Sequence, residues 1–153
     1  MVKPTDIKKY LSQAYFKSKR LEKLNEQIGF YRAKAMKQTS AWSDSPSGGV
    51  STTSPQAVFI EKLMLLTDEL NEEAIRMLEF EKEARKLINL LDSEREKMFL
   101  EDYHVNKMTM EKIALQRHYS ERQVYRVMGD AYRKLSDIVN EDEELERRIL
   151  EVI

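Results

Sequence analysis

The sequence predicts an all-α protein: a long antiparallel helical hairpin, coiled-coil-like in its apolar spacing, followed by a C-terminal helix-turn-helix domain. Three observations predict this fold. The 153 residues include only four Gly and three Pro, with 35% charged and 41% hydrophobic residues, which is typical of helical proteins. Apolar residues recur at intervals of three and four over two long stretches. Two N-cap candidates, Thr109 and Ser120, mark two short helices in the C-terminal third.

The first long helix is predicted over residues 1–36. Its apolar or small positions alternate in steps of four and three, as in a coiled-coil seam of about four heptads: Ile7, Leu11, Ala14, Ser18, Leu21, Asn25, Ile28 and Ala35. Residues 37–56 are rich in Ser, Thr, Gly and Pro and predict a linker. Trp42 is the only tryptophan, and we expect it to dock on the hairpin rather than on a partner.

The second long helix is predicted over residues 57–91, with an apolar stripe that includes Phe59, Leu63, Leu66 and Leu70. Its charge is opposite to that of the first helix. Residues 1–36 contain nine basic and three acidic residues, whereas residues 56–92 contain five basic and nine acidic ones. Opposite charge favours antiparallel pairing. Because two helices bury little surface on their own, the hairpin needs a second copy or the C-terminal domain to complete its core, and we expect a homodimer through the hairpin.

Residues 92–139 are predicted to form the helix-turn-helix domain. Ser93 and Glu96 have capping-box spacing at the start of a supporting helix. In the following stretch, 109–135, Ala114 is the small residue at which two helices could cross. His118 occupies the turn position where Gly is usual, because the left-handed backbone conformation is easiest for Gly. His adopts this conformation more readily than most residues do.

The recognition helix is predicted over residues 120–137. Its core-facing side carries Val124, Val127, Ala131 and Leu135. Its outward side could enter a DNA major groove, and it carries Glu121, Arg122, Gln123, Tyr125 and Arg126. Residues 107–134 contain seven basic residues against three acidic ones. We therefore predict a DNA-reading domain; the alternative is a plain helical hairpin with a solvated charged face.

The segment 93–135 resembles region 4 of sigma-70-type factors. The shared skeleton is the supporting helix SEREKMFLEDY, then T-x-x-x-I-A, then S-x-x-x-V-x-x-V-x-x-x-A-x-x-x-L. Together with the opening KPTDIKKYLSQAY and the S-D-S-P stretch, the chain resembles the ArpU/RinA-type phage regulators. Arg117 and His118 depart from the usual apolar–Gly pair. The resemblance implies control of late-gene transcription in a phage or prophage of a low-GC Gram-positive bacterium.

The sigma-like pattern also implies roles for single residues. Glu121, Arg122 and Arg126 would read bases, with Gln123 and Tyr125 beside them. Phosphate contacts, which position the domain, would come from Lys112, Arg117, Ser120 and Arg133. The implied partner is double-stranded DNA, and host RNA polymerase is a further candidate partner.

Several function classes are not expected. No apolar run approaches the length of a membrane span and no secretory leader is visible, so we expect a protein of the bacterial cytoplasm, nucleoid-associated when bound to DNA. No catalytic motif is present, and we expect neither an enzyme nor a cofactor. His104 and His118 lack cysteine partners, so we expect no metal site.

Two other functions remain open. A DNA-packaging protein similar to a terminase small subunit also combines a helix-turn-helix with oligomerisation. A polymerase-binding adaptor would use the same domain to contact protein. The acidic segment 140–153 is predicted to dock on the first helix or on a partner, or else to fray.

Overall fold

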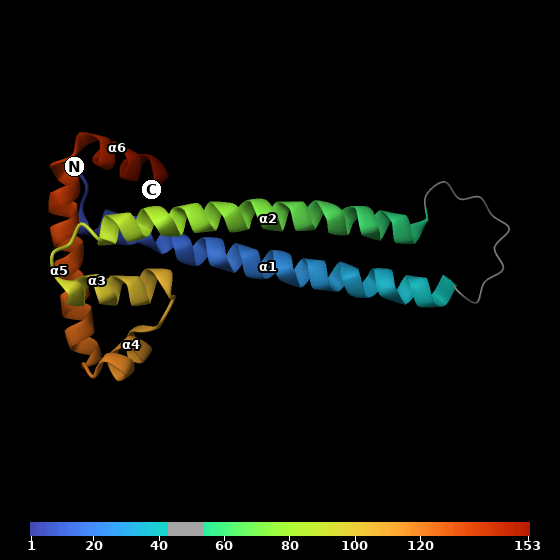
Figure 1. The fold of residues 1–153 in the computed structure, drawn as a ribbon, viewed down its shortest axis with the longest axis horizontal. Coiled ribbons are helices and arrows are strands. Elements are labelled where there is room, and N and C mark those ends of the chain that lie inside the picture. The colour runs from blue at the N-terminus through green and yellow to red at the C-terminus, as the bar shows by residue number, and fades with distance from the viewer. Residues whose placement is uncertain (43–53) are drawn as a thin grey trace. The chain divides into compact units, whose positions relative to one another are not determined.

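A computed structural model describes the backbone of residues 1–42 and 54–153 and the side chains of residues 1–37 and 54–153. Throughout these described residues the regular structure is helical, which confirms the all-α class. The helices are α1 (Pro4–Trp42), α2 (Pro55–Ile88), α3 (Glu94–Leu100), the π-helical turn η1 (Glu101–Val105), α4 (Met110–Arg117), α5 (Glu121–Asn140) and α6 (Glu143–Val152); Figure 1 labels the α-helices. None of them combines the length and apolar character needed to cross a membrane.

Both long helices extend into the predicted linker. Helix α1 continues to Trp42, and the next proline after Pro4 is Pro46, which comes later in the chain. Helix α2 begins with Pro55. Proline is favourable at the first position of a helix, because the N–H group that it lacks would have no partner within the helix there. Ser54 caps it by accepting a hydrogen bond from the Ala57 N–H (3.1 Å). The side chain of Trp42 lies outside the described residues.

The chain divides into two compact units. One unit contains residues 17–76, and the other contains residues 1–16 together with 77–153. The first part of α1 (residues 1–16) and the last part of α2 (from residue 77) therefore belong to the same unit as the C-terminal helices. The sequence had predicted that both long helices lie entirely in the hairpin. The physical reason is that Ile7 and Leu11 have the same spacing as the apolar residues of the segment 21–35, although they are buried in the core of the other unit.

Within residues 17–76, the two helical segments run in opposite directions. Arg20 reaches Glu69 (3.8 Å) and Glu73 (3.6 Å), whereas Tyr31, further along, contacts residues earlier in α2. Its ring centroid lies 6.1 Å from that of Phe59, and Lys62 Nζ lies 4.8 Å from its centroid. Glu73 is buried, and Arg76 holds its carboxylate from the same helix (3.0 Å). These ionic and aromatic contacts define the register of this pair.

The core of the other unit is built around Phe99, which is fully buried. Helix α5 contacts α3, α4 and α6. Asn140 ties the end of α5 to the chain's start: its Oδ1 accepts from the Val2 N–H (2.7 Å) and its Nδ2 donates to the Val2 carbonyl (3.0 Å). The acidic segment 140–153 forms α6, whose Ile149 is buried and whose Arg148 pairs with Glu83 (2.8 Å). This segment is docked rather than frayed.

Candidate nucleic-acid interface

Helices α4 and α5 are joined by a turn that their own side chains define. Thr109 caps α4 by accepting from the Lys112 N–H (3.2 Å). His118 ends it in the left-handed conformation (φ 60°, ψ 42°), with its N–H directed to the Ala114 carbonyl. Tyr119 N donates to the same carbonyl (3.0 Å). Ser120 caps α5 in the same way. The two N-caps and the left-handed turn residue predicted from the sequence are therefore confirmed.

A capping box begins α5. The Ser120 hydroxyl oxygen accepts from the Gln123 N–H (3.1 Å), and the Gln123 Oε1 accepts from the Ser120 N–H (2.9 Å). The Ser120 hydroxyl also lies 3.1 Å from that Oε1. The Ser120 hydroxyl and the Gln123 Oε1, which belong to residues predicted to contact DNA, are therefore used in hydrogen bonds that cap the helix. Gln123 keeps only its amide N–H groups for a base, and Ser120 is primarily a cap.

The core-facing side of α5 is fully packed. Val124, Val127, Ala131 and Leu135 are each at most 7% exposed, as the spacing predicted. The opposite side carries Arg122, Arg126 and Arg133, which are all exposed. At about 100° per residue these three side chains fall within about 40° of one another around the helix axis. Glu121 and Tyr125 are also exposed, beside this arginine line.

The four residues assigned to phosphate contacts differ in their surroundings. Lys112 is exposed on α4. Arg133 is exposed and pairs with Asp130 one turn earlier in α5. Arg117 donates to the buried Asp102 through Nε (3.0 Å) and Nη2 (3.3 Å). The hydrogen bonds and the charge of Asp102 raise the pKa of the Arg117 guanidinium, which stays charged.

The π-helical turn η1 aims two polar side chains inward. Asp102 meets Arg117 at the end of α4, and His104 meets Tyr132 on α5, with 2.6 Å between Nε2 and the hydroxyl oxygen. Such a turn inserts one residue into the helical repeat, which changes the direction of the following side chains. Burial, assisted by the charge of Lys8, lowers the pKa of His104 to about 3. Burial likewise raises the pKa of Tyr132, so both partners are neutral at pH 7.

Sequence reasoning missed Asp102 and Tyr132 as residues that hold the interface together, and it considered His104 only as a metal ligand. The available signal was the presence of Asp102 and His104 between the apolar residues Phe99, Leu100 and Val105. Glu96 was expected to complete a capping box with Ser93. Ser93 does accept from the Glu96 N–H (3.4 Å), but the Glu96 carboxylate contacts Lys134 on α5. Within the described residues, no group of three or more His, Asp or Glu side chains could hold a metal ion.

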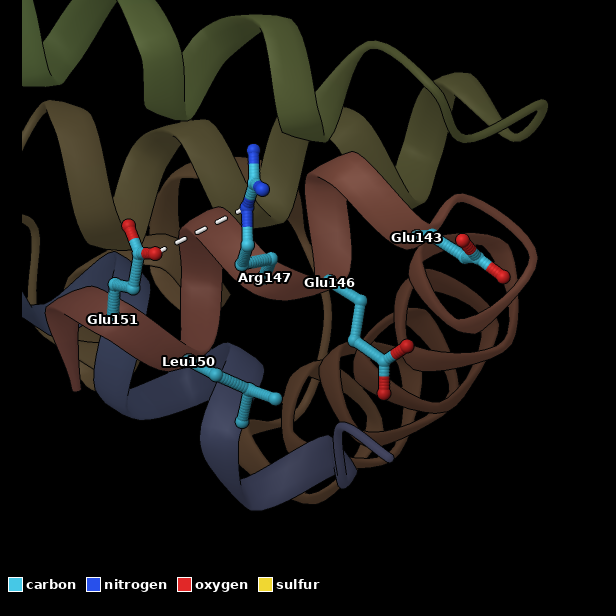
Figure 2. A pocket seen from close by; sticks show the side chains of 5 residues that line it. All are labelled: Glu143, Glu146, Arg147, Leu150 and Glu151. Carbon is cyan, nitrogen blue, oxygen red and sulfur yellow. Dashed lines mark ion pairs between the residues drawn. The ribbon is translucent and has the colours of Figure 1, made fainter.

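The outer surface of α6 has the opposite electrostatic character. Figure 2 shows a shallow hollow whose five lining side chains all come from this helix: Glu143, Glu146, Arg147, Leu150 and Glu151. Arg147 Nε lies 4.0 Å from a Glu151 oxygen, so even the one basic group faces an acid. This surface would repel DNA phosphates.

Comparison with protein-family models, with curated proteins and with solved structures finds no match. The assignment of function therefore depends on the geometry of α4, the turn and α5.

Proposed function

We propose that this chain is a sequence-specific DNA-binding transcription regulator that inserts α5 into a major groove. The observation that carries the proposal is the exposed line of Arg122, Arg126 and Arg133, opposite a buried stripe on the same helix. Arginine pairs with guanine O6 and N7 through two donors, which makes it the commonest base-reading side chain. A helix fixed along one whole side can present such donors with a defined geometry.

The local architecture supports a helix-turn-helix. Two capped helices meet through a short turn with a left-handed residue, His118, and Ala114 lies buried where they approach. In this motif the second helix enters the groove and its N-terminal residues contact base edges. We propose that residues 17–76 form the helical hairpin that precedes it and joins two copies. The C-terminal domain is then of the sigma region 4-like type.

The contacts refine the roles of the single residues. We assign base reading to Arg122 and Arg126, with Glu121, Tyr125 and the Gln123 amide N–H groups beside them. We assign phosphate contact to Lys112 and Arg133, since both side chains are exposed. Arg117 acts mainly through Asp102, by fixing the turn. Ser120 also helps to fix the turn, because its side chain caps the start of α5.

The biological setting belongs to the same proposal. The resemblance to ArpU/RinA-type regulators suggests control of phage or prophage late genes, with host RNA polymerase as a second partner. Dimerisation would give two recognition helices on a repeated or palindromic site. Because one helix-turn-helix with few basic residues binds weakly, linkage of two copies raises the affinity through effective concentration.

The test is selection of bound fragments from the genome of the source phage or host, using purified full-length protein at moderate salt. We expect enrichment of a site that the Arg122→Ala variant no longer selects. Arg147→Ala provides a matched control, because Arg147 is exposed on the acidic surface of α6. Equal recovery of all fragments, or of none, would reject sequence-specific binding.

The same preparation separates the two alternatives. A ring-sized oligomer in light scattering, with DNA binding that ignores sequence, would favour a packaging protein. Absence of any salt-dependent DNA affinity would favour a polymerase-binding adaptor, since phosphate contact always brings salt dependence.

A further inference from the structure

We propose that a hollow between α1 and α5 binds one phosphate group of the DNA backbone, through the ammonium of Lys8 and the hydroxyl groups of Thr5 and Tyr125. This inference rests on the proposed function and deepens it, because it assigns a further DNA contact to a helix outside the helix-turn-helix. The hollow has a volume of about 220 Å³ and is called here the phosphate hollow. Its lining consists of these three residues and of apolar ones that include Met110, Met128 and Gly129.

The start of α1 is fixed against α5. Both belong to the same compact unit of the chain. The Val2 backbone forms two hydrogen bonds with the Asn140 side chain at the end of α5, at 2.7 and 3.0 Å. Ile7 and Leu11 are fully buried, in the same core as the packed side of α5. Because Lys8 lies between these two anchors, it keeps its place beside α5 when α5 binds DNA.

The Lys8 side chain is directed toward α5. It lies about 100° around the helix axis from the buried Ile7, and it lines the same hollow as Tyr125. Burial lowers the pKa of His104 to about 3, and the positive charge of Lys8 assists it, which requires the ammonium to lie on the side of α1 that faces η1. The adjacent Lys9 is also exposed, but it lies about 100° further around the axis, away from the hollow.

On α5 the phosphate hollow lies between the packed side and the arginine line. At about 100° per residue, Gly129 lies about 20° from Arg122 around the axis and Tyr125 about 60°, both toward the buried Met128. An α-helix with its side chains is about 10–12 Å across, and the major groove is about 12 Å wide. A recognition helix therefore fills the groove, and its two flanks face the phosphates that border the groove. The hollow lies on one of these flanks.

Lys8 is not used in an ion pair within the protein. Three other cations of the same unit are each paired with an acid: Arg117 with Asp102, Lys107 with Glu81 and Lys134 with Glu96. Within the described part of the chain, no carboxylate pairs with Lys8 and none lines the hollow. An exposed cation without an internal partner, beside a helix that faces DNA, can neutralise a phosphate. Charge and position together therefore identify the occupant as the DNA backbone.

Two hydroxyl groups complete the set of donors. Thr5 lies about one turn before Lys8 on α1 and is exposed, and Tyr125 is 65% exposed. Lysine, threonine and tyrosine side chains all donate to DNA phosphates without reading sequence. Gly129 adds no side chain that would fill the hollow, and nothing lies within 4 Å of the place where its Cβ would be. The Tyr125 hydroxyl then contacts the backbone, beside the bases that the arginines read.

The test measures the affinity of full-length wild type, Lys8→Gln, Lys8→Arg and Lys9→Gln for the selected site and for random DNA, by fluorescence anisotropy at several salt concentrations. Lys8→Gln should bind both DNAs more weakly by the same factor, roughly five- to tenfold at about 0.1 M salt, and should reduce the salt slope by about one. Lys8→Arg should keep the wild-type slope, because a guanidinium also binds phosphate. Lys9→Gln removes the same charge from the other side of α1, and should change either affinity less than about twofold.

A neutral methylphosphonate, placed in turn at each backbone position of the selected site, identifies the phosphate concerned. At that position it should weaken binding of the wild type and of Lys9→Gln but not of Lys8→Gln. If no position has this effect, or if Lys8→Gln and Lys9→Gln weaken binding equally, the phosphate hollow is overturned.

Three further outcomes separate this inference from the proposed function. A loss by Lys8→Gln that is confined to the selected site would overturn the phosphate contact in favour of base reading. Unchanged DNA affinity of Lys8→Gln, with an altered oligomeric state in sedimentation, would overturn it in favour of a protein contact. Both outcomes leave the proposed function intact, whereas a wild type without DNA affinity would overturn the proposed function and this inference together.

Discussion

The guanidinium of Arg117 and the carboxylate of Asp102 form a two-point contact, 3.0 Å from Nε to Oδ2 and 3.3 Å from Nη2 to Oδ1. Asp102 is only 4% exposed and lies in the π-helical turn η1, fifteen residues before its partner. The contact joins the last residue of α4 to the supporting helices immediately before the left-handed residue His118. It therefore fixes the direction in which α5 leaves the turn.

Replacement of Asp102 by Asn is expected to lower the midpoint of thermal unfolding, because it removes the charge that the Arg117 guanidinium faces. Asp130→Asn is the matched control: its pair with Arg133 is exposed and lies within one helix, where ion pairs contribute little. Circular dichroism of both variants checks this. An equal shift in the two variants would contradict a structural role for the Asp102–Arg117 contact.

The buried pair of His104 and Tyr132 predicts a pH dependence. Unfolded histidine takes up a proton as the pH falls through 6.5, whereas burial holds the pKa of folded His104 near 3. Its contribution to stability is thus complete above pH 6.5 and is lost progressively between 6.5 and 3. Between pH 7.5 and 5 the wild type should lose about 2 kcal/mol more free energy of unfolding than His104→Gln, which does not titrate. Urea unfolding at both pH values measures this difference, and equal losses would exclude a buried neutral histidine.

Gly129 provides a stabilising substitution. It lies inside α5, half-exposed beside the arginine line, and a Cβ atom there would meet nothing within 4 Å. Gly129→Ala should raise the free energy of unfolding by about 0.5–1 kcal/mol, because alanine loses less backbone freedom in a helix. Urea unfolding tests this. A destabilised variant would mean that something packs closely against this position in the free protein.

Lys112 is expected to contact phosphate without reading sequence. Lys112→Ala should weaken binding to specific and random DNA by the same factor and reduce the salt slope of log affinity by about one. Fluorescence anisotropy at several salt concentrations measures both quantities. Lys82→Ala, an exposed lysine on α2, serves as the control. A loss confined to the specific site would instead assign Lys112 to base reading.

Local signals could be predicted from the sequence. The caps Thr109 and Ser120, the left-handed His118 and the buried stripe of α5 all depend on residues within one or two helical turns of each other. Such local features can be predicted from the residue types and their spacing. The same is true of the all-α class, which follows from periodicity and from the scarcity of Gly and Pro.

Long-range pairing could not be predicted in this way. Ile7 and Leu11 have the same spacing as Leu24 and Ile28, so periodicity defines the buried side of α1 but not what covers it. A capping-box pattern at Ser93 and Glu96 does not reveal that Lys134, 38 residues later, binds the Glu96 carboxylate. The Asp102–Arg117 contact likewise depends on the turn η1, which the sequence interpretation had as ordinary helix.

The most direct test of base reading by α5 is the affinity of Arg126→Ala for the selected site and for random DNA, beside Arg147→Ala. Loss of a two-donor contact to guanine costs about 1–3 kcal/mol at the specific site and little on random DNA. We therefore expect Arg126→Ala to bind the specific site roughly 5- to 150-fold more weakly, with random DNA nearly unaffected and Arg147→Ala like the wild type. Equal losses on both DNAs, or no loss on either, would contradict base reading by α5.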